Sequence, residues 1–363
     1  MMPAAYTRTP DNYRTMPDDE LRRRIKAKKA EHGKNLVILT HHYQRLGVVE
    51  FGDYQGDSYA LCKIGAELEA EYIVFCGVHF MAESAVILAR PDQKVYLPNP
   101  LAGCPMADMA AIDSVFAAWD ELQHHLPGSK IIPISYMNSA ADLKAFCGKN
   151  DGVICTSSNA HKAFDWAFGR GERIFFFPDE HLGRNTANKY GIPKDEMFVW
   201  DFNANPAKRD VEALKRAKVI LWKGYCHVHS VFQPHHIEQM RSDYPGIKIV
   251  VHPECTEQLV AMADSVGSTS HIVKYVAEQP AGSVIAVGTE LNLVDRLSHM
   301  HPDKKILELA GNTCAMCVNM YRTTLNDLAY TLDNLATIKP MSVYDDVKIH
   351  ARIALERMLA ITG

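Results

Sequence analysis

The sequence has no apolar run of the length needed to cross a membrane, which takes about 18 consecutive apolar residues. It also has no basic excess, since 39 Lys and Arg residues stand against 43 Asp and Glu residues, for a net charge of −4. Nucleic-acid-binding proteins usually carry a basic patch or have a high pI. The polar stretch 1–24 has no apolar segment of the secretory-signal type and predicts a loose arm before a helix at Leu21–His32. We therefore expect a protein that binds neither nucleic acid nor membranes.

The cysteine pattern of a secreted, disulfide-bonded protein is missing as well. The chain has 9 cysteines among 363 residues, whereas secreted disulfide frameworks are small, cysteine-dense and even-numbered. This pattern predicts a cytoplasmic protein with free thiols. Some of the thiols lie in apolar segments and are expected to pack in the core as small hydrophobic residues, namely Cys62, Cys76, Cys147 and Cys155.

No Gly/Ser-rich linker or low-complexity segment divides the chain, although its length is too great for one ordinary core. Short apolar runs alternate with helical patterns, which is typical of parallel strands covered by helices on both faces. The pattern predicts α/β architecture with three small sheets rather than one large sheet. The predicted strands are Asn35–Thr40, Glu71–Phe75, Lys94–Leu97, Lys130–Ile134, Gly152–Cys155, Arg173–Phe177, Lys218–Trp222, Ile247–Val251, Ser283–Val287 and Lys304–Leu309. The tail beyond Met341 has one apolar helical face and predicts a helix packed on the body.

Polar and reactive side chains follow most of these predicted strands. In open parallel sheets, ligands bind beyond the carboxyl ends of the strands. A purely structural α/β protein would not need so many reactive groups there, so we expect a binding site at these ends. The segments are His41-His42, Tyr136-Met137-Asn138, Thr156-Ser157-Ser158-Asn159, Pro178-Asp179-Glu180-His181, Cys226-His227-Val228-His229, His252-Pro253-Glu254-Cys255 and Gly288-Thr289-Glu290.

Three loop cysteines, Cys104, Cys226 and Cys317, lie about a hundred residues apart, each shortly after an apolar run. If the chain folds as three similar units around an axis, these thiolates can meet at one point and hold a metal centre with one open position. Such a centre favours Lewis-acid chemistry over a structural role. Structural zinc sites use two Cys-x2-Cys pairs, but the chain has one, at Cys314 and Cys317, and the ferredoxin spacings are also missing. The spacing alone leaves zinc and iron open.

Widely separated motifs carry a family resemblance. They are His41-x-Tyr43-Gln44, Gly56-Asp57-Ser58, Met81-Ala82-Glu83-Ser84, Gly103-Cys104-Pro105-Met106-Ala107, Ser135-Tyr136-x-Asn138-Ser139, Cys155-Thr156-Ser157-Ser158-Asn159-Ala160, Pro178-Asp179-x-x-Leu182-Gly183, Gly224-x-Cys226-x-Val228-His229, His252-Pro253-Glu254-Cys255, Gly267-Ser268-Thr269, Gly288-Thr289-Glu290 and Cys317-x-x-Met320. From about Leu36 to the C-terminal helix, the sequence resembles the quinolinate synthases, bacterial and plastid enzymes of de novo NAD synthesis.

The resemblance implies three three-layer αβα domains with parallel sheets around a pseudo-threefold axis. The implied domains are 1–110 with the C-terminal segment 315–363 packed back on it, 111–225, and 226–314. A 4Fe-4S cluster is implied at the centre. Cys104, Cys226 and Cys317 would each bind one iron, and the fourth iron would be open to substrate.

The implied reaction condenses iminoaspartate with dihydroxyacetone phosphate to quinolinate, releasing phosphate and two waters. The open iron would act as the Lewis acid that takes up a departing hydroxyl. The resemblance also implies a functional link to the enzyme that supplies iminoaspartate.

Enolisation and isomerisation need general acids and bases. Glu254, directly after a predicted strand, is predicted as the base, with His229 and Tyr43 as proton donors or relays. Ser157 and the pair Ser268 and Thr269 precede predicted helices, whose free amide groups favour anions. The substrate-binding residues implied by the family are His41, Ser58, Tyr136, Asn138, Ser157, His252, Ser268 and Thr269.

Two other functions remain open from the residues alone. A zinc hydrolase would use Cys226, His227, His229 and Glu254, whereas a non-enzymatic redox sensor would use the pair Cys314 and Cys317. The absorption spectrum separates the three hypotheses, because an iron–sulfur protein is brown and absorbs broadly near ~400 nm.

Overall fold

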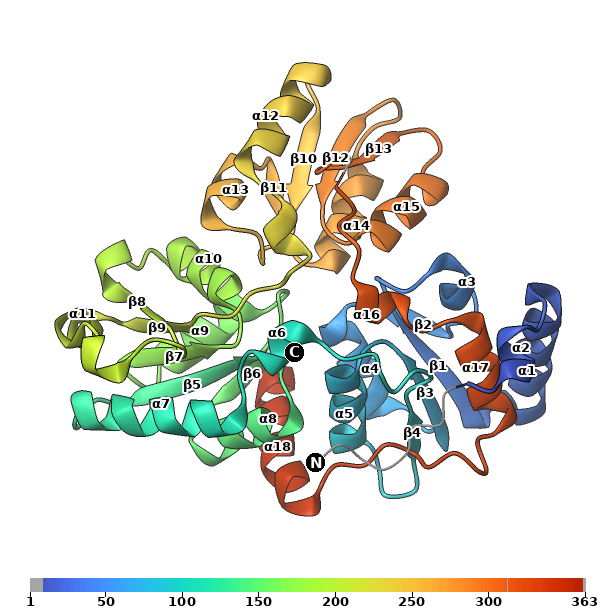
Figure 1. Ribbon diagram of the computed structural model, residues 1–363, viewed down its shortest axis with the longest axis horizontal. Helices are drawn as coiled ribbons and strands as arrows, with labels where there is room; N and C mark the ends of the chain where they lie inside the picture. The colour runs from blue at the N-terminus through green and yellow to red at the C-terminus, as the bar shows by residue number, and fades with distance from the viewer. Residues whose placement is uncertain (1–8, 312, 362–363) are drawn as a thin grey trace. The chain divides into compact units, whose positions relative to one another are not determined.

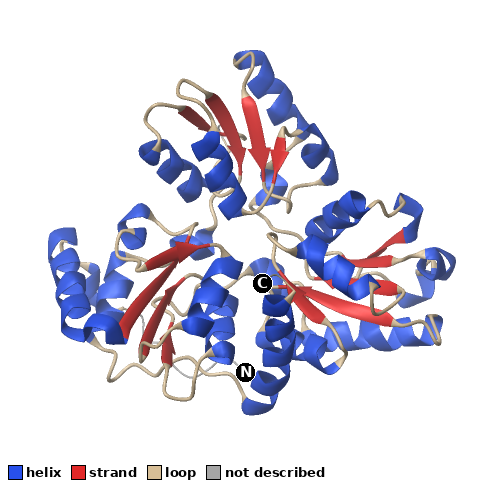
Figure 2. Cartoon of the chain, turned by 180° about the vertical axis from the view of Figure 1, so that it is seen from behind, coloured by secondary structure: helices blue, strands red, loops and turns tan. Residues whose placement is uncertain are grey.

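The structure is a computed structural model and describes residues 9–311 and 313–361. Its internal contacts divide the chain into two units, the first made of residues up to Cys104 with Met316–Val343, and the second of Pro105–Ala315 with the segment from Tyr344 onward. Helices cover both faces of the sheets (Figures 1 and 2). Among the described residues, no helix combines the length and apolarity that a membrane span requires.

The first unit is built on one four-stranded parallel sheet with the order β2-β1-β3-β4. Alternate residues of these strands, such as Ile38 and Val74, pack with Leu328 of α17 in one buried cluster. On the opposite face, Gly65 of α4 lies against Leu39. The elements are α1 (Asp11–Arg14), α2 (Asp18–His32), β1 (Leu36–His41), α3 (Leu46–Val49), β2 (Tyr54–Gly56), α4 (Ser58–Glu67), β3 (Tyr72–Cys76), α5 (His79–Leu88), β4 (Lys94–Tyr96), α16 (Val318–Tyr321) and α17 (Leu325–Asp333).

The second unit contains two parallel sheets, the first of which has five strands in the order β6-β5-β7-β9-β8. Side chains of a strand alternate between its faces, and β7 uses both, since Phe175 stacks on Trp119 of α7 and Phe176 packs on Phe164 of α9. The elements are α6 (Pro105–Asp108), α7 (Ile112–His125), β5 (Ile131–Tyr136), α8 (Ala141–Lys149), β6 (Val153–Cys155), α9 (Ala160–Phe168), β7 (Arg173–Phe177), α10 (Glu180–Tyr190), β8 (Met197–Trp200), α11 (Val211–Arg216) and β9 (Val219–Trp222).

The other sheet of this unit has four strands in the order β11-β10-β12-β13. Counted along the chain, its strands are arranged like those of the first unit, with the second strand at one edge followed by the first, third and fourth. Its elements are α12 (Pro234–Asp243), β10 (Lys248–Val251), α13 (Glu257–Met262), β11 (Ser265–Val266), α14 (Thr269–Glu278), β12 (Val284–Gly288), α15 (Leu291–Met300) and β13 (Lys305–Glu308). Helix α18 (Asp345–Ala360) follows after the segment that belongs to the first unit.

The predicted α/β class with three parallel sheets is confirmed, and each of the ten predicted strands is present. Three strands were not predicted, namely β2, β8 and β11. All three lie at sheet edges and are only partly buried. β2 and β11 are short and carry no continuous apolar run, whereas β8 is a run of four apolar residues that was not recognised as a strand. The boundaries 1–110, 111–225 and 226–314 and the pseudo-threefold axis stay predictions.

The predicted loose arm is wrong for residues 9–20, whereas the helix predicted at Leu21–His32 is present within α2; residues 1–8 lie outside the described part of the chain. Helix α1 and the start of α2 occupy this stretch. Tyr13 is buried against Tyr330, and its hydroxyl donates to Asp333 at 2.8 Å. This burial of an aromatic side chain stabilises the segment against α17.

The predicted C-terminal helix is present, but its expected packing on the first domain is wrong. Helix α18 packs against α8 and β6 of the second unit. The two helices approach closely at Gly148, where a Cβ atom would clash with the backbone carbonyl of His350. The segment 315–363 is therefore divided, since Met316–Val343 belongs to the first unit and α18 to the second.

We expect Gly148→Ala to destabilise the protein, because the added methyl group must push α18 away from α8. Overpacking of this kind costs about 1–3 kcal/mol, which lowers the melting temperature by a few degrees. Gly65→Ala is the matched control, since Gly65 also lies in a helix but a Cβ there would meet only Leu39 Cδ1 at 3.9 Å. The control should keep or raise the melting temperature, because Ala favours the helix over Gly by about 0.5–1 kcal/mol. Equal effects of the two changes in a thermal-unfolding experiment would contradict the close contact.

Candidate active site

Polar side chains of the second unit meet at the carboxyl ends of strands from both of its sheets. Tyr136 is the last residue of β5, while His252 and Thr289 directly follow β10 and β12. The backbone nitrogen of His252 donates to the carbonyl of Gly288 at 3.1 Å, which extends the pairing of β10 with β12 into this region. Parallel pairing thus brings residues far apart in the sequence to one edge, as expected for a ligand site in such sheets.

Glu254 lies in the middle of this group and is only 3% exposed. Its Oε1 accepts a hydrogen bond of 2.5 Å from the hydroxyl of Tyr136, and its Oε2 is 2.8 Å from Nδ1 of His229. The ring of His229 stacks on that of His252 with 4.4 Å between centroids. Among the described residues, the carboxylate hydrogen bonds of Glu254 go to Tyr136 and His229.

Two buried carboxyl groups near this site have pKa values shifted in opposite directions. Burial alone would raise the pKa of Glu254, but His252, His229 and the hydrogen bonds of His229 and Tyr136 outweigh it and hold the pKa below its usual range. Burial and the negative charge of Glu254 raise the pKa of Asp179 well above its usual range. The surroundings of Glu254 thus favour its ionised form, whereas those of Asp179 favour its neutral form. Such divergence between neighbouring acids is typical of functional sites.

Helix α10 holds the loop that carries Glu254. The side-chain amide of Asn185 donates to the carbonyl oxygens of Pro253 and Cys255, at 2.8 and 2.7 Å, on either side of Glu254. At the start of the same helix, Asp179 accepts from the backbone of Leu182 at 2.8 Å. The backbone nitrogen of Glu180 donates to the carbonyl of Gly224, two residues before Cys226. One helix thus fixes both the Glu254 loop and the start of the Cys226 loop.

Cys226 lies close enough to this pair to form a metal site with it. One potential ligand atom from each of Cys226, His229 and Glu254 lies within 4.8 Å of the other two. His229 and Glu254 are buried, whereas Cys226 is half-buried. The other ring nitrogen of His229, Nε2, is 3.1 Å from the hydroxyl oxygen of Thr289. A thiolate, an imidazole and a carboxylate form a donor set that suits zinc and other divalent transition metals.

The first unit carries the other predicted site residues at the carboxyl ends of β1 and β2. His41 ends β1 and is buried, and its Nδ1 accepts from the backbone nitrogen of Tyr43 at 3.2 Å. Their rings are 4.9 Å apart. Ser58 begins α4, two residues after the end of β2, and the side chain of Asp57 caps that helix. His41, Tyr43 and Ser58 thus lie at or just after the carboxyl ends of two adjacent strands, although β2 was not predicted from the sequence.

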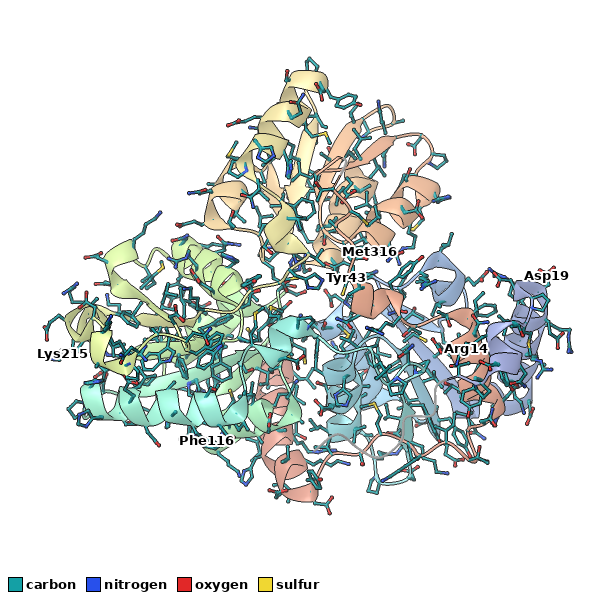
Figure 3. All side chains as sticks on the ribbon, in the orientation of Figure 1. Arg14, Asp19, Tyr43, Phe116, Lys215 and Met316 are labelled. Carbon is teal, nitrogen blue, oxygen red and sulfur yellow. The ribbon has the colours of Figure 1, made fainter. Side chains whose placement is uncertain are left out.

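Cys104 and Cys317 also belong to the first unit and lie in neighbouring segments of it. The side chain of Gln44 donates to the carbonyl of Met320 at 3.1 Å, which holds α16, directly after Cys317, beside the β1 end. In the Cys104 loop, Asn99 donates to the carbonyl of Arg322 at 3.1 Å. Figure 3 shows Tyr43 and Met316 at the same end of this unit.

The residues predicted to bind anions follow strands of the second unit. The side chain of Ser268 caps α14 by accepting a hydrogen bond from the backbone nitrogen of His271. Thr269 is buried in the first turn of that helix. Ser157 is half-buried in the turn before α9, and Asn138 lies beside that turn because Met137 donates to the carbonyl of Cys155 at 2.7 Å. The buried Oδ1 of Asn138 has no hydrogen-bond partner among the described residues, so this acceptor is available to a ligand.

Three residues of the site were not predicted from the sequence. Asp179 and Thr289 lie in segments that the polar strand ends already marked, but nothing in the sequence distinguished them from their neighbours. Asn185 lies in the middle of a helix and gave no signal. Its role arises from tertiary contacts with a loop about seventy residues further along the chain.

The cysteines fall into two groups by exposure. Cys62, Cys76, Cys147 and Cys155 are buried, which confirms their predicted core positions, and Cys255 is buried as well. Burial raises the pKa of the Cys76, Cys147, Cys155 and Cys255 thiols. The other thiols are half-buried or exposed and lie in loops, namely Cys104, Cys226, Cys314 and Cys317.

Comparison with known proteins gives one consistent result. Residues 23–360 match the family model described as quinolinate synthetase A protein. A quinolinate synthase of Acidobacterium capsulatum is 50% identical over 97% of this chain and 96% of its own length. Similar proteins of the same name occur in Rhodopirellula baltica, at 46% identity over 96% of this chain and 93% of its own, and in Haloarcula marismortui, at 46% over 97% and 94%.

Thiol labelling should separate the two groups of cysteines. In cluster-free native protein under anaerobic conditions, iodoacetamide should modify Cys104, Cys226, Cys314 and Cys317, because thiolate formation requires solvent access. The buried thiols should react only after denaturation. Peptide mass spectrometry measures both outcomes, and rapid labelling of Cys147 or Cys155 in the native protein would contradict the buried positions.

Proposed function

The chain belongs to the quinolinate synthetase A family, and we propose that it condenses iminoaspartate with dihydroxyacetone phosphate to quinolinate, releasing phosphate and two waters. The observation that carries this proposal is the full-length similarity to quinolinate synthases together with the intact motifs around Glu254 and the three loop cysteines. A place in NAD synthesis, a cytoplasmic location and a functional link to the enzyme that supplies iminoaspartate belong to the same proposal.

A 4Fe-4S cluster fits the donor set of this chain. Cys104, Cys226 and Cys317 would hold it, since their thiols are half-buried in loops rather than packed in the core. When bound, the cluster would supply a Lewis acid at its open iron for the loss of hydroxyl groups. Three similar domains around a pseudo-threefold axis belong to the same proposal, and the strand order shared by the sheets of the first unit and of β10–β13 supports the similarity of two of them.

Glu254 and His229 would act as a pair in proton transfer. A carboxylate whose pKa is lowered stays ionised but is a weak base, so Glu254 acts best by orienting His229. His229 would then take or give the proton at Nε2, where its present partner is the neutral hydroxyl of Thr289. Tyr136, which donates to Glu254, would keep the carboxylate in place, and Tyr43 is the proton relay proposed from the first unit.

Groups that could bind substrate anions lie at strand ends in each unit. Asn138, Ser157, Ser268 and Thr269 supply hydroxyl or amide groups at strand ends of the second unit, together with Tyr136 and His252. His41 and Ser58 supply further groups from the first unit. Free backbone amide groups at the start of α14 add to the attraction of a carboxylate or phosphate.

Replacing a proposed cluster ligand should remove iron without unfolding the chain. Cys104→Ser, Cys226→Ser and Cys317→Ser should each lose most iron, the absorption near ~400 nm and quinolinate formation. Cys314→Ser is the matched control because it alters the neighbouring exposed thiol of the same loop. Iron analysis and visible spectra of anaerobically purified protein test this. A full cluster in Cys317→Ser and none in Cys314→Ser would reverse the assignment.

Glu254→Gln should leave the cluster in place and lower turnover by ~100-fold or more, the usual scale for general acid–base catalysis. The change keeps the shape of the side chain but removes the charge that orients His229. Glu257→Gln provides the control, because Glu257 lies on the adjacent helix and pairs with Lys194. Quinolinate formation should be near normal in the control, and near-normal turnover in Glu254→Gln would move the acid–base role elsewhere.

A further inference from the structure

The group formed by Cys226, His229 and Glu254 has the properties of a binding site for a single metal ion. We propose that the cluster-free chain binds one Zn²⁺ ion through these three residues. We further infer that this ion and the iron–sulfur cluster exclude each other, a step that rests on the proposed function because Cys226 would belong to both.

The distances and donor types favour zinc. Tetrahedral zinc lies about 2.0–2.3 Å from thiolate, imidazole and carboxylate ligands, so the donor atoms around it lie about 3–4 Å apart. The three donor atoms already lie within 4.8 Å of one another. Rotation of the half-buried Cys226 side chain would bring its sulfur to the shorter distance that zinc requires. Nδ1 of His229 and Oε2 of Glu254 are now 2.8 Å apart and share a hydrogen bond. A zinc ion would replace the proton of that hydrogen bond.

The surrounding hydrogen bonds are those of a prepared metal site. Metal-binding histidines usually donate their second ring N–H to an oxygen atom, and metal-binding carboxylates are hydrogen-bonded in turn. With Nδ1 on the metal, Nε2 of His229 would donate to the hydroxyl of Thr289, 3.1 Å away. Tyr136 already donates to the carboxylate oxygen of Glu254 that does not face His229. Asn185 fixes the backbone on both sides of Glu254.

Charge and access also fit a divalent cation. A thiolate and a carboxylate together carry two negative charges, which neutralise Zn²⁺ in a site where an unpaired charge would be costly. Glu254 and His229 are buried while Cys226 is half-buried, so the thiol marks the side from which an ion enters. Three protein ligands leave the fourth position to water, as in catalytic rather than structural zinc sites.

Zinc binding by the cluster-free full-length chain tests the proposal. The protein is prepared anaerobically, freed of iron with a chelator, and titrated with Zn²⁺ against a chromophoric zinc indicator. We expect one ion per chain. Co²⁺ in its place should give a thiolate charge-transfer band, which Cys226→Ser abolishes. Glu254→Gln and His229→Ala should each weaken zinc binding by at least ~100-fold, since loss of a ligand costs more than the 10–100-fold typical of outer-shell changes.

Crossed controls separate the zinc site from the cluster site. Cys104→Ser and Cys317→Ser should bind zinc as the unaltered chain does, although neither should hold a cluster. Glu254→Gln should hold a cluster but bind zinc poorly, and its near-isosteric change keeps the test valid if His229→Ala fails to fold. Zinc loading of the unaltered chain should reduce its iron uptake during cluster reconstitution.

Three results would overturn the zinc site. They are loss of zinc binding in Cys104→Ser or Cys317→Ser, unchanged zinc affinity in Glu254→Gln, or no zinc binding at one equivalent by the unaltered chain. If the zinc-loaded protein takes up iron as the zinc-free protein does, the exclusion step is wrong. A chain that takes up no iron under any condition would instead count against the proposed function, and the zinc titration would still decide the zinc site.

Discussion

The charge of one buried carboxylate, Glu254, determines how the rest of the second unit is arranged around it. An ionised carboxylate taken out of water costs several kcal/mol unless it is paired and hydrogen-bonded. Glu254 receives a tyrosine hydroxyl from the end of β5 and an imidazole from the loop after β9, while its own loop follows β10. Compensating this one charge therefore ties together two sheets whose strands lie far apart in the sequence.

Helix α10 fixes the loops around Glu254 in place through hydrogen bonds. Asn185 holds the Glu254 loop, and the main chain at Asp179 and Glu180 holds the segment that leads to Cys226. Gly183 brings the helix onto β7 and β9, since a Cβ there would meet Phe176 and Leu221. Burial, and after it the negative charge of Glu254, raise the pKa of Asp179 and favour its neutral form.

Much of the fold could be predicted because central strands of parallel sheets are buried on both faces and read as apolar runs. Edge strands such as β2 and β11 were not predicted, because they are partly exposed to solvent and their sequences therefore lack a continuous apolar run. The grouping of some site residues could also be anticipated, since Tyr136 ends β5 while Glu254 and His229 lie in the loops that follow β10 and β9. Asn185 and the packing of α18 on α8 were not, because both depend on contacts between segments that local sequence does not relate.

Cys226 is a ligand in both of the proposed metal sites, the zinc site and the iron–sulfur cluster. Its thiol lies within reach of an imidazole and a carboxylate, a mixed donor set that suits a single divalent ion. The cluster proposed above would use thiolate ligands alone, with Cys226 as one of them. The zinc donors all come from the second unit and need no contribution from the first. The second unit can therefore complete a mononuclear site by itself, and a Cys226 thiolate that is bound to zinc would not be available to the proposed cluster.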